Sequence, residues 1–202
     1  NNIKAVYVDE QKSLVYIGTH AGGLTVLHRN SGQMESFNQL NSQLVNENVY
    51  AILPDKEGSI LLGTLSALVS FNPEKRSFTT IDKEKDGTPF TSQRITILFR
   101  DSRKRLWIGG EEGISVFQQE GIEIEKAPIL PESSVTKMFT NCIYEAANGI
   151  IWVGTREGFY CFNEKEKKIK RYTTANGLPN NVVYGILEDT FGRLWVSTNR
   201  GI

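Results

Sequence analysis

A four-residue phrase recurs five times along the chain, and no other sequence feature restricts the possible folds as strongly. It stands at Tyr16-Ile17-Gly18-Thr19, Leu61-Leu62-Gly63-Thr64, Trp107-Ile108-Gly109-Gly110, Trp152-Val153-Gly154-Thr155 and Trp195-Val196-Ser197-Thr198. The third residues of these phrases are separated by 45, 46, 45 and 43 positions. A period of about 40–50 residues is typical of β-propellers and solenoids, whose units bury their faces against one another. The 202 residues are therefore interpreted as about four and a half copies of one structural unit.

Each unit has the pattern of four short strands. In the last complete unit the strand-like pieces begin at Cys142, Asn148, Gly158 and Lys168; they are rich in β-branched and aromatic residues and are bounded by turn residues. Four such strands joined by hairpins form one antiparallel blade of a propeller. The sequence predicts an all-β chain with few helices.

The repeat register also predicts where each blade begins and ends. The blades are expected at approximately residues 1–45, 46–91, 92–137, 138–179 and, incomplete, 180–202. A closed ring needs complete blades. The fold class is accordingly a β-propeller, here an open arc of about four and a half blades cut from a larger, seven-bladed ring. The chain has no initiator Met and no signal-like start, so residue 1 is interpreted as not being the natural N-terminus.

The repeated positions predict the packing between blades. Second-strand residues expected between blades are Trp107, Trp152, Trp195, Tyr16 and Leu61. Aliphatic or similar residues expected on first strands near the central channel are Val6, Ile52, Leu98, Cys142 and Ile186. The repeated glycines Gly18, Gly63, Gly109 and Gly154 indicate close backbone approach between neighbouring blades.

Charge and cysteine content exclude several classes of function. The formal net charge is zero, so the chain lacks the basic surface on which nucleic-acid binding depends. Locally basic residues 165–171 are interpreted as a solvated hairpin tip. Cys142 and Cys161 fall on the first and third strands of one blade, about 9–10 Å apart, which is too far for a disulfide. We therefore expect two free, buried thiols.

The sequence predicts no catalytic residues, no metal site and no cofactor. His20 and His28 are the two histidines, and neither has a carboxylate or cysteine at metal-ligand spacing. For binding, loops between second and third strands are expected to share one face with the segments that link the blades. Asn and Arg side chains there offer fixed hydrogen-bond groups for sugars. The candidate ligand-binding residues are His20, Arg94, Asn141, Arg156, Asn181, Asn199 and Arg200.

One stretch of the sequence resembles a known repeat. Gly177-Leu178-Pro179-Asn180-Asn181-Val182-Val183, followed by Ile186 to Asp189, Gly192 to Thr198 and Gly201-Ile202, closely resembles the two-component regulator propeller repeat. The segments from Ile95 to Phe117 and from Cys142 to Phe162 match the same pattern. Departures occur at Leu65-Ser66-Ala67, at Ser197 and at Glu145-Ala146, and they leave the fold unaffected.

The resemblance implies a sensory role. Such repeats form seven-bladed propellers, often two in tandem, in the periplasmic ectodomain of inner-membrane hybrid two-component receptors. It implies an oligosaccharide ligand, contacts with the remaining blades and the second propeller, a homodimeric receptor, and histidine kinase activity outside this segment. Two alternatives stay open: a polysaccharide lyase or hydrolase on a propeller scaffold, and a protein-interaction propeller without a small ligand, for which Phe90 and Phe139 are the candidate contacts.

Overall fold

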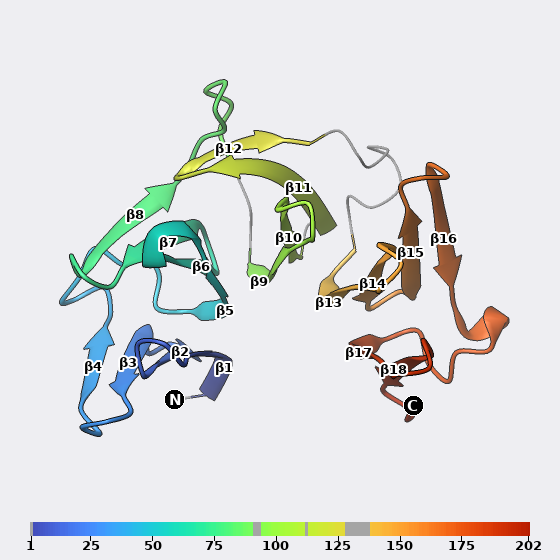
Figure 1. Cartoon of the computed structure of the whole chain (residues 1–202), viewed down its shortest axis with the longest axis horizontal. Coiled ribbons are helices and arrows are strands. Elements are labelled where there is room, and N and C mark those ends of the chain that lie inside the picture. Colours follow the sequence, from blue (N-terminus) through green and yellow to red (C-terminus); the bar gives the residue numbers. More distant parts are fainter. Residues whose placement is uncertain (1, 91–93, 112, 128–137) are drawn as a thin grey trace. The chain divides into compact units, whose positions relative to one another are not determined.

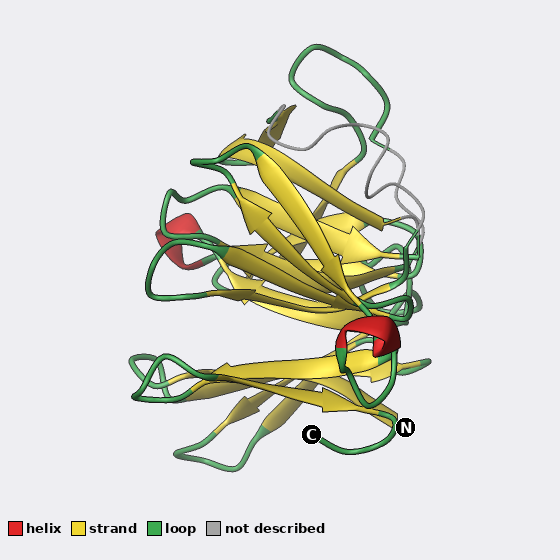
Figure 2. Ribbon diagram, turned by 90° about the vertical axis from the view of Figure 1, so that its right-hand side faces the viewer, coloured by secondary structure: helices red, strands yellow, loops and turns green. Residues whose placement is uncertain are grey.

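The computed structural model describes residues 2–90, 94–111, 113–127 and 138–202. Its regular structure is almost entirely antiparallel β-sheet, as Figure 2 shows in yellow. Two short 3-10 turns, η1 (Lys56–Gly58) and η2 (Thr174–Asn176), are the helical elements in the described part. No helix among the described residues is long and apolar enough to span a membrane.

Consecutive strands pair with one another to form each sheet (Figure 1). The first sheet contains β1 (Asn2–Asp9), β2 (Leu14–His20), β3 (Leu24–His28) and β4 (Met34–Phe37). The second contains β5 (Val49–Pro54), β6 (Ile60–Thr64), β7 (Leu68–Asn72) and β8 (Ser77–Ile81). The third contains β9 (Ile95–Arg100), β10 (Leu106–Gly110), β11 (Gly113–Glu120) and β12 (Glu123–Lys126). The fourth contains β13 (Thr140–Glu145), β14 (Ile151–Thr155), β15 (Phe159–Asn163) and β16 (Lys168–Tyr172), and β17 (Val183–Glu188) pairs with β18 (Leu194–Thr198).

The chain divides into two compact units. Unit 1 comprises residues 1–98 and 118–126, and unit 2 comprises residues 99–117 and 127–202. Unit 1 has a core in which Phe37, Phe71 and Phe78 pack with ring centroids 4.5–5.5 Å apart. Unit 2 has a core around Trp107 and Phe162, whose ring centroids are 6.2 Å apart.

The repeated glycines lie where one blade meets the first strand of the next, which confirms the predicted close approach. A Cβ on Gly18 would come within 2.8 Å of Val49, and one on Gly154 within 2.6 Å of Val183. Gly63 against Ile95 and Gly109 against Thr140 repeat this geometry. A side chain at these positions would push the neighbouring strand away, which explains why glycine recurs in the phrase.

The first strands carry a repeated irregularity that the sequence analysis missed. The pairing register shifts between Ile3 and Ala5, and equivalent shifts occur in β5, β13 and β17. A bulge of this kind adds one residue and re-aims the side chains beyond it. One predicted first-strand residue must therefore be corrected: Cys142 pairs with Gly154, and Ile143 occupies the position equivalent to Ile52 and Ile186.

Five residues that the sequence assigned to packing positions or to the interior are only partly buried or exposed. Trp107, Tyr16 and Leu61 are buried as expected, but Trp195 is 49% exposed and Trp152 is only partly buried. Val6 on β1 is 56% exposed, because no described strand covers it. The thiols of Cys142 and Cys161 are free and lie on β13 and β15, with β14 between them, but they are half-buried rather than buried.

Candidate functional site

The threonine of the repeated phrase closes the loop between the second and third strands of a blade. Its hydroxyl donates to a backbone carbonyl three or four residues further on, at 2.8–3.1 Å. The four pairs are Thr19 with Gly23, Thr64 with Ala67, Thr155 with Gly158 and Thr198 with Gly201. These loops are therefore held in one compact form, which fixes the side chains that they present.

In unit 1 the loop after β2 lies against the segment that links β4 to β5. The Gly23 N–H donates to the Glu47 carbonyl at 2.8 Å, and the Ala21 N–H donates to Asn48 Oδ1 at 3.1 Å. This arrangement confirms, within unit 1, the prediction that these two kinds of loop share a face.

Two of the candidate residues lie around one aromatic ring in unit 1. His20, the last residue of β2, has its Nδ1 3.4 Å from the Tyr50 hydroxyl, and their ring centroids are 6.3 Å apart. The guanidinium carbon of Arg94 lies 5.6 Å from the centroid of the Tyr50 ring. The three side chains present an imidazole, a phenol and a guanidinium together, a set that can hydrogen-bond and stack on a sugar.

Tyr50 was missed by the sequence analysis. It stands directly after Val49, as Asn141 stands after Thr140, and Asn141 was singled out. Aligning the blades residue by residue at this position would have identified it.

In unit 2 the candidates divide into exposed side chains and side chains that stabilise loops. Arg156 is exposed and lies with its guanidinium carbon 3.8 Å from the centroid of the Phe139 ring. Asn199 and Arg200 are exposed in the loop after β18. By contrast, Asn141 Nδ2 donates to the Val183 carbonyl at 2.8 Å, and Asn181 Oδ1 accepts from the Thr174 N–H at 2.8 Å. The side-chain amides of Asn141 and Asn181 therefore have a structural role, because each is hydrogen-bonded to the backbone.

The remaining chemistry of the described residues is sparse. No three His, Cys, Asp or Glu side chains gather there in a way that could hold a metal ion. Burial raises the pKa of Cys142 to about 11, so its thiol is protonated at neutral pH and is a poor nucleophile.

Comparison with known proteins identifies the repeat. The four-stranded antiparallel blades, with their period and their glycine contacts, define a β-propeller protein. Residues 133–157 and 177–200 match the sequence profile of the two component regulator propeller family, so the chain carries repeats of that family.

The similar proteins are a histidine kinase and the extracellular domains of two-component systems. Over 172 residues the chain is 30% identical to histidine kinase P4 of Formosa agariphila, a match that covers 81% of this chain and 12% of that protein. A crystal structure of the extracellular domain of BT4673 from B. thetaiotaomicron, described as a hybrid two component system, has a TM-score of 0.79 at 20% identity, covering 100% of this chain and 26% of that one. The equivalent domain of BT3049 gives 0.77 at 24%, covering 98% and 27%. These likenesses confirm the all-β propeller fold; the number of blades in the ring stays a prediction.

Proposed function

We propose that this chain is part of the extracytoplasmic, sensory propeller of a hybrid two-component receptor. The observation that carries the proposal is the pair of family repeats, together with 30% identity to a histidine kinase along 81% of the chain. The chain spans about an eighth of that relative, so the kinase, its output and the membrane anchor belong to the proposal. The proposal also includes a periplasmic location, a homodimeric receptor, and contacts with further blades and a second propeller.

The proposed ligand is an oligosaccharide, and this segment binds without turnover. The loop face of unit 1 supports it, because His20, Tyr50 and Arg94 offer hydrogen-bond groups beside an aromatic ring. Arg156 on Phe139 offers a similar pair in unit 2. Sugars are recognised by such combinations of a stacking surface and directional donors.

A thermal-shift screen against plant, host and microbial oligosaccharides tests this function. A ligand at 100 times its dissociation constant should stabilise the folded state by about 2.7 kcal/mol. The matching rise in melting temperature is a few degrees. Stabilisation with the sugar recovered intact supports a sensor, whereas product formation would make the chain an enzyme. No shift with any sugar would favour a protein partner and end the glycan assignment.

A further inference from the structure

The strongest unassigned feature is a polar groove of about 460 Å³ in unit 2. Its walls are the turn between β9 and β10, the turn between β13 and β14, and the hairpin between β15 and β16. None of the candidate residues from the sequence lies in it. Its volume falls within the range of about 300–1,000 Å³ that is usual for small-molecule sites.

Two lining residues of the groove, Arg105 and Glu164, belong to a chain of charged hydrogen bonds that continues to Asp101 and Trp107. Asp101 Oδ2 accepts from Trp107 Nε1 at 2.8 Å and from Arg105 Nε at 2.6 Å. The Arg105 side chain is 7% exposed, and its Nη1 donates to both carboxylate oxygens of Glu164 at 3.0–3.1 Å. Burial lowers the pKa of Arg105, but the hydrogen bonds and charges of Asp101 and Glu164 together outweigh it and raise the pKa. Such a network holds its members in one geometry.

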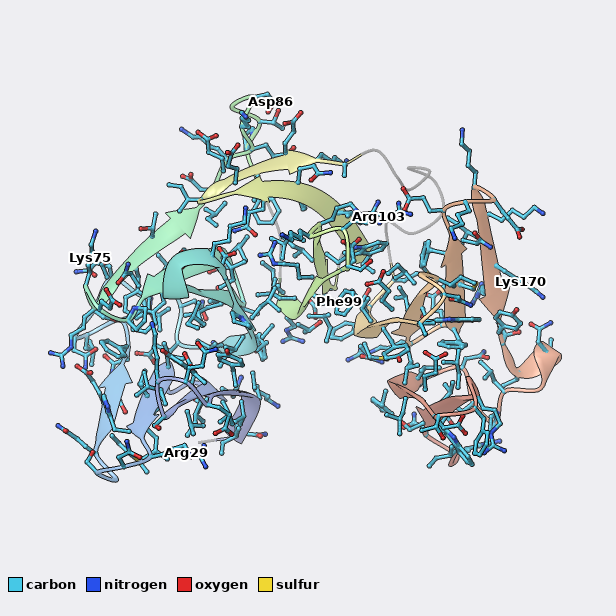
Figure 3. All side chains as sticks on the ribbon, viewed as in Figure 1. Arg29, Lys75, Asp86, Phe99, Arg103 and Lys170 are labelled. Atoms are coloured by element: carbon cyan, nitrogen blue, oxygen red, sulfur yellow. The ribbon has the colours of Figure 1, made fainter. Side chains whose placement is uncertain are left out.

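The carboxylates of the groove are already engaged as acceptors. Glu145 accepts from the Ser102 N–H and from the Ser102 hydroxyl, both at 2.7 Å. Glu164 accepts from Arg105 and also from Nη1 of Arg103, which lies in the β9–β10 turn (Figure 3). Both carboxylates are thus occupied by donors of the protein itself.

Several donors of the groove remain available. Among the described residues, Nε and Nη2 of Arg103 donate to no acceptor, and the Lys165 ammonium forms no ion pair. Asn148 and Asn163 use their side-chain oxygens in the turns, which leaves their amide NH₂ groups. The Nε–Nη2 edge of an arginine matches a carboxylate or sulfate in a bidentate manner. The groove therefore offers donors and cations in excess of free acceptors.

We infer that this groove binds an anionic oligosaccharide, one that carries carboxylate or sulfate groups. Arg103 and Lys165 contact the anion, and the amides of Asn148 and Asn163 donate to sugar oxygens. This inference rests on the proposed function, since it names the ligand class and gives it a place different from the loop face. Lys165 belongs to the basic stretch that the sequence analysis interpreted as a solvated hairpin tip.

Isothermal titration of the purified protein tests the inference with two matched pairs of probes. One pair is trigalacturonic acid and its fully methyl-esterified form; the other is a sulfated chondroitin tetrasaccharide and its desulfated, carboxyl-reduced form. We expect at least one anionic probe to bind at least tenfold more tightly than its neutral counterpart, with an affinity that falls as NaCl is raised. The galacturonate pair tests recognition of carboxylate alone, whereas the chondroitin pair tests carboxylate and sulfate together.

Lys165→Glu tests whether the anionic probe binds in this groove. Because the Lys165 ammonium forms no ion pair with any described residue, the substitution should leave the melting temperature unchanged while weakening binding of the anionic probe at least tenfold. The control is Lys75→Glu, at the tip of the β7–β8 hairpin, which should bind as the wild type does. Equal binding by Lys165→Glu and the wild type would overturn the inference. Binding of neutral probes alone would also overturn it but leave the proposed function standing, whereas binding of no saccharide in the wider screen would end both.

Discussion

At the scale of the residue, one aspartate organises a turn and a strand together. Asp101 accepts from the backbone N–H groups of Arg103 and Arg105 as well as from the side chains of Arg105 and Trp107. Asp189 repeats the arrangement with Arg193 and Trp195, but at an exposed site. The indoles of Trp107 and Trp195 are thus hydrogen-bond donors, a role that their apolar neighbours in the sequence do not indicate.

This pair of sites gives a matched test of burial. Asp101→Asn replaces one carboxylate oxygen by an NH₂ donor that faces Arg105 and Trp107, and it removes one of the two charge partners of a guanidinium that is 7% exposed. Losing one partner of a buried ion pair costs about 3–5 kcal/mol. Asp189→Asn should cost clearly less, because the Arg193 side chain is 65% exposed. Urea unfolding of both variants measures the difference, and equal losses would contradict the argument.

Asp189 should also make the stability of the folded state depend on pH in the acid range. Burial opposes the shift, but hydrogen bonds from Arg193, Trp195 and the Phe191 N–H hold the pKa of Asp189 below its ordinary value. A carboxylate with a lowered folded-state pKa contributes stability above its unfolded value, near pH 3.9, and loses it as the pH falls through the folded value. Unfolding midpoints measured between pH 2 and 6 should therefore fall less steeply for Asp189→Asn than for the wild type. Parallel curves would refute the assignment.

Tyr16 carries a buried hydroxyl that makes no hydrogen bond within the described residues. Burial, and secondarily Asp9 and Tyr7, raises the pKa of Tyr16 to about 12. Because an unsatisfied buried hydroxyl costs about 1–3 kcal/mol, Tyr16→Phe should preserve or increase stability by about 1 kcal/mol. Tyr16→Ala should instead cost about 3–5 kcal/mol by opening a cavity. Chemical unfolding of both variants checks the prediction, and a loss above 1 kcal/mol in Tyr16→Phe would reveal a partner for the hydroxyl.

The two cysteines should resist alkylation. Burial raises the pKa of Cys142 to about 11 and also raises that of Cys161, so little reactive thiolate is present at pH 8. Because the folded-state pKa of Cys142 is raised, its protonated thiol contributes stability below the unfolded-state pKa, near pH 8.5. This contribution is lost as the pH rises towards 11. Iodoacetamide labelling followed by mass spectrometry should be slow in buffer and fast in 6 M urea. Rapid double labelling in buffer would contradict the burial of these side chains.

At the scale of the element, a carboxylate at the end of a first strand joins one blade to the turn of the preceding blade. Glu145 at the end of β13 accepts from the Ser102 N–H, and Glu188 at the end of β17 accepts from the Ala147 N–H at 3.1 Å. Glu188 also accepts from the Tyr144 hydroxyl at 3.0 Å. These contacts repeat at equivalent positions and hold neighbouring blades in register within unit 2.

Glu145→Gln tests this contact. A glutamine keeps one acceptor oxygen for the two Ser102 donors, so one hydrogen bond is lost and the free energy of unfolding should fall by about 1–2 kcal/mol. Glu166→Gln is the control, because Glu166 pairs with Lys168 in solvent, and it should change stability by less than about 0.5 kcal/mol. Equal effects of the two substitutions, measured by urea unfolding, would show that the contact between blades contributes nothing.

The strands were predictable from the sequence because each repeats a short pattern bounded by turn residues. Gly18, Gly63, Gly109 and Gly154 were predictable in the same way, since identical residues at one period serve one packing position. The bulges in the first strands were not, because a one-residue register shift leaves no mark in composition. The groove beside Arg103 was missed because its residues come from three turns of two different sheets, which are far apart in the sequence.

At the scale of the whole molecule, the difference in exposure between equivalent tryptophans shows that the surface of β17 and β18 is accessible to solvent. Trp107 is 1% exposed, whereas Trp195 is 49% exposed. Leu187, which pairs directly with Trp195 across β17 and β18, is 65% exposed, and nearby Tyr184 is 54% exposed. Exposed apolar side chains on an edge pair of strands form a surface that associates with other strands.

The 202-residue chain, produced alone, should therefore self-associate as its concentration rises, and Leu187→Lys should suppress this. The introduced ammonium would have to be desolvated in any contact between sheets, which opposes association without touching a buried residue. Leu40→Lys is the matched control, because Leu40 is 93% exposed and lies in the segment between β4 and β5, outside the β17–β18 pair. Sedimentation velocity over a hundredfold concentration range measures the effect. A monomer at every concentration, or equal suppression by Leu40→Lys, would show that the β17–β18 surface does not drive association, and the exposed Trp195 would then need a different explanation.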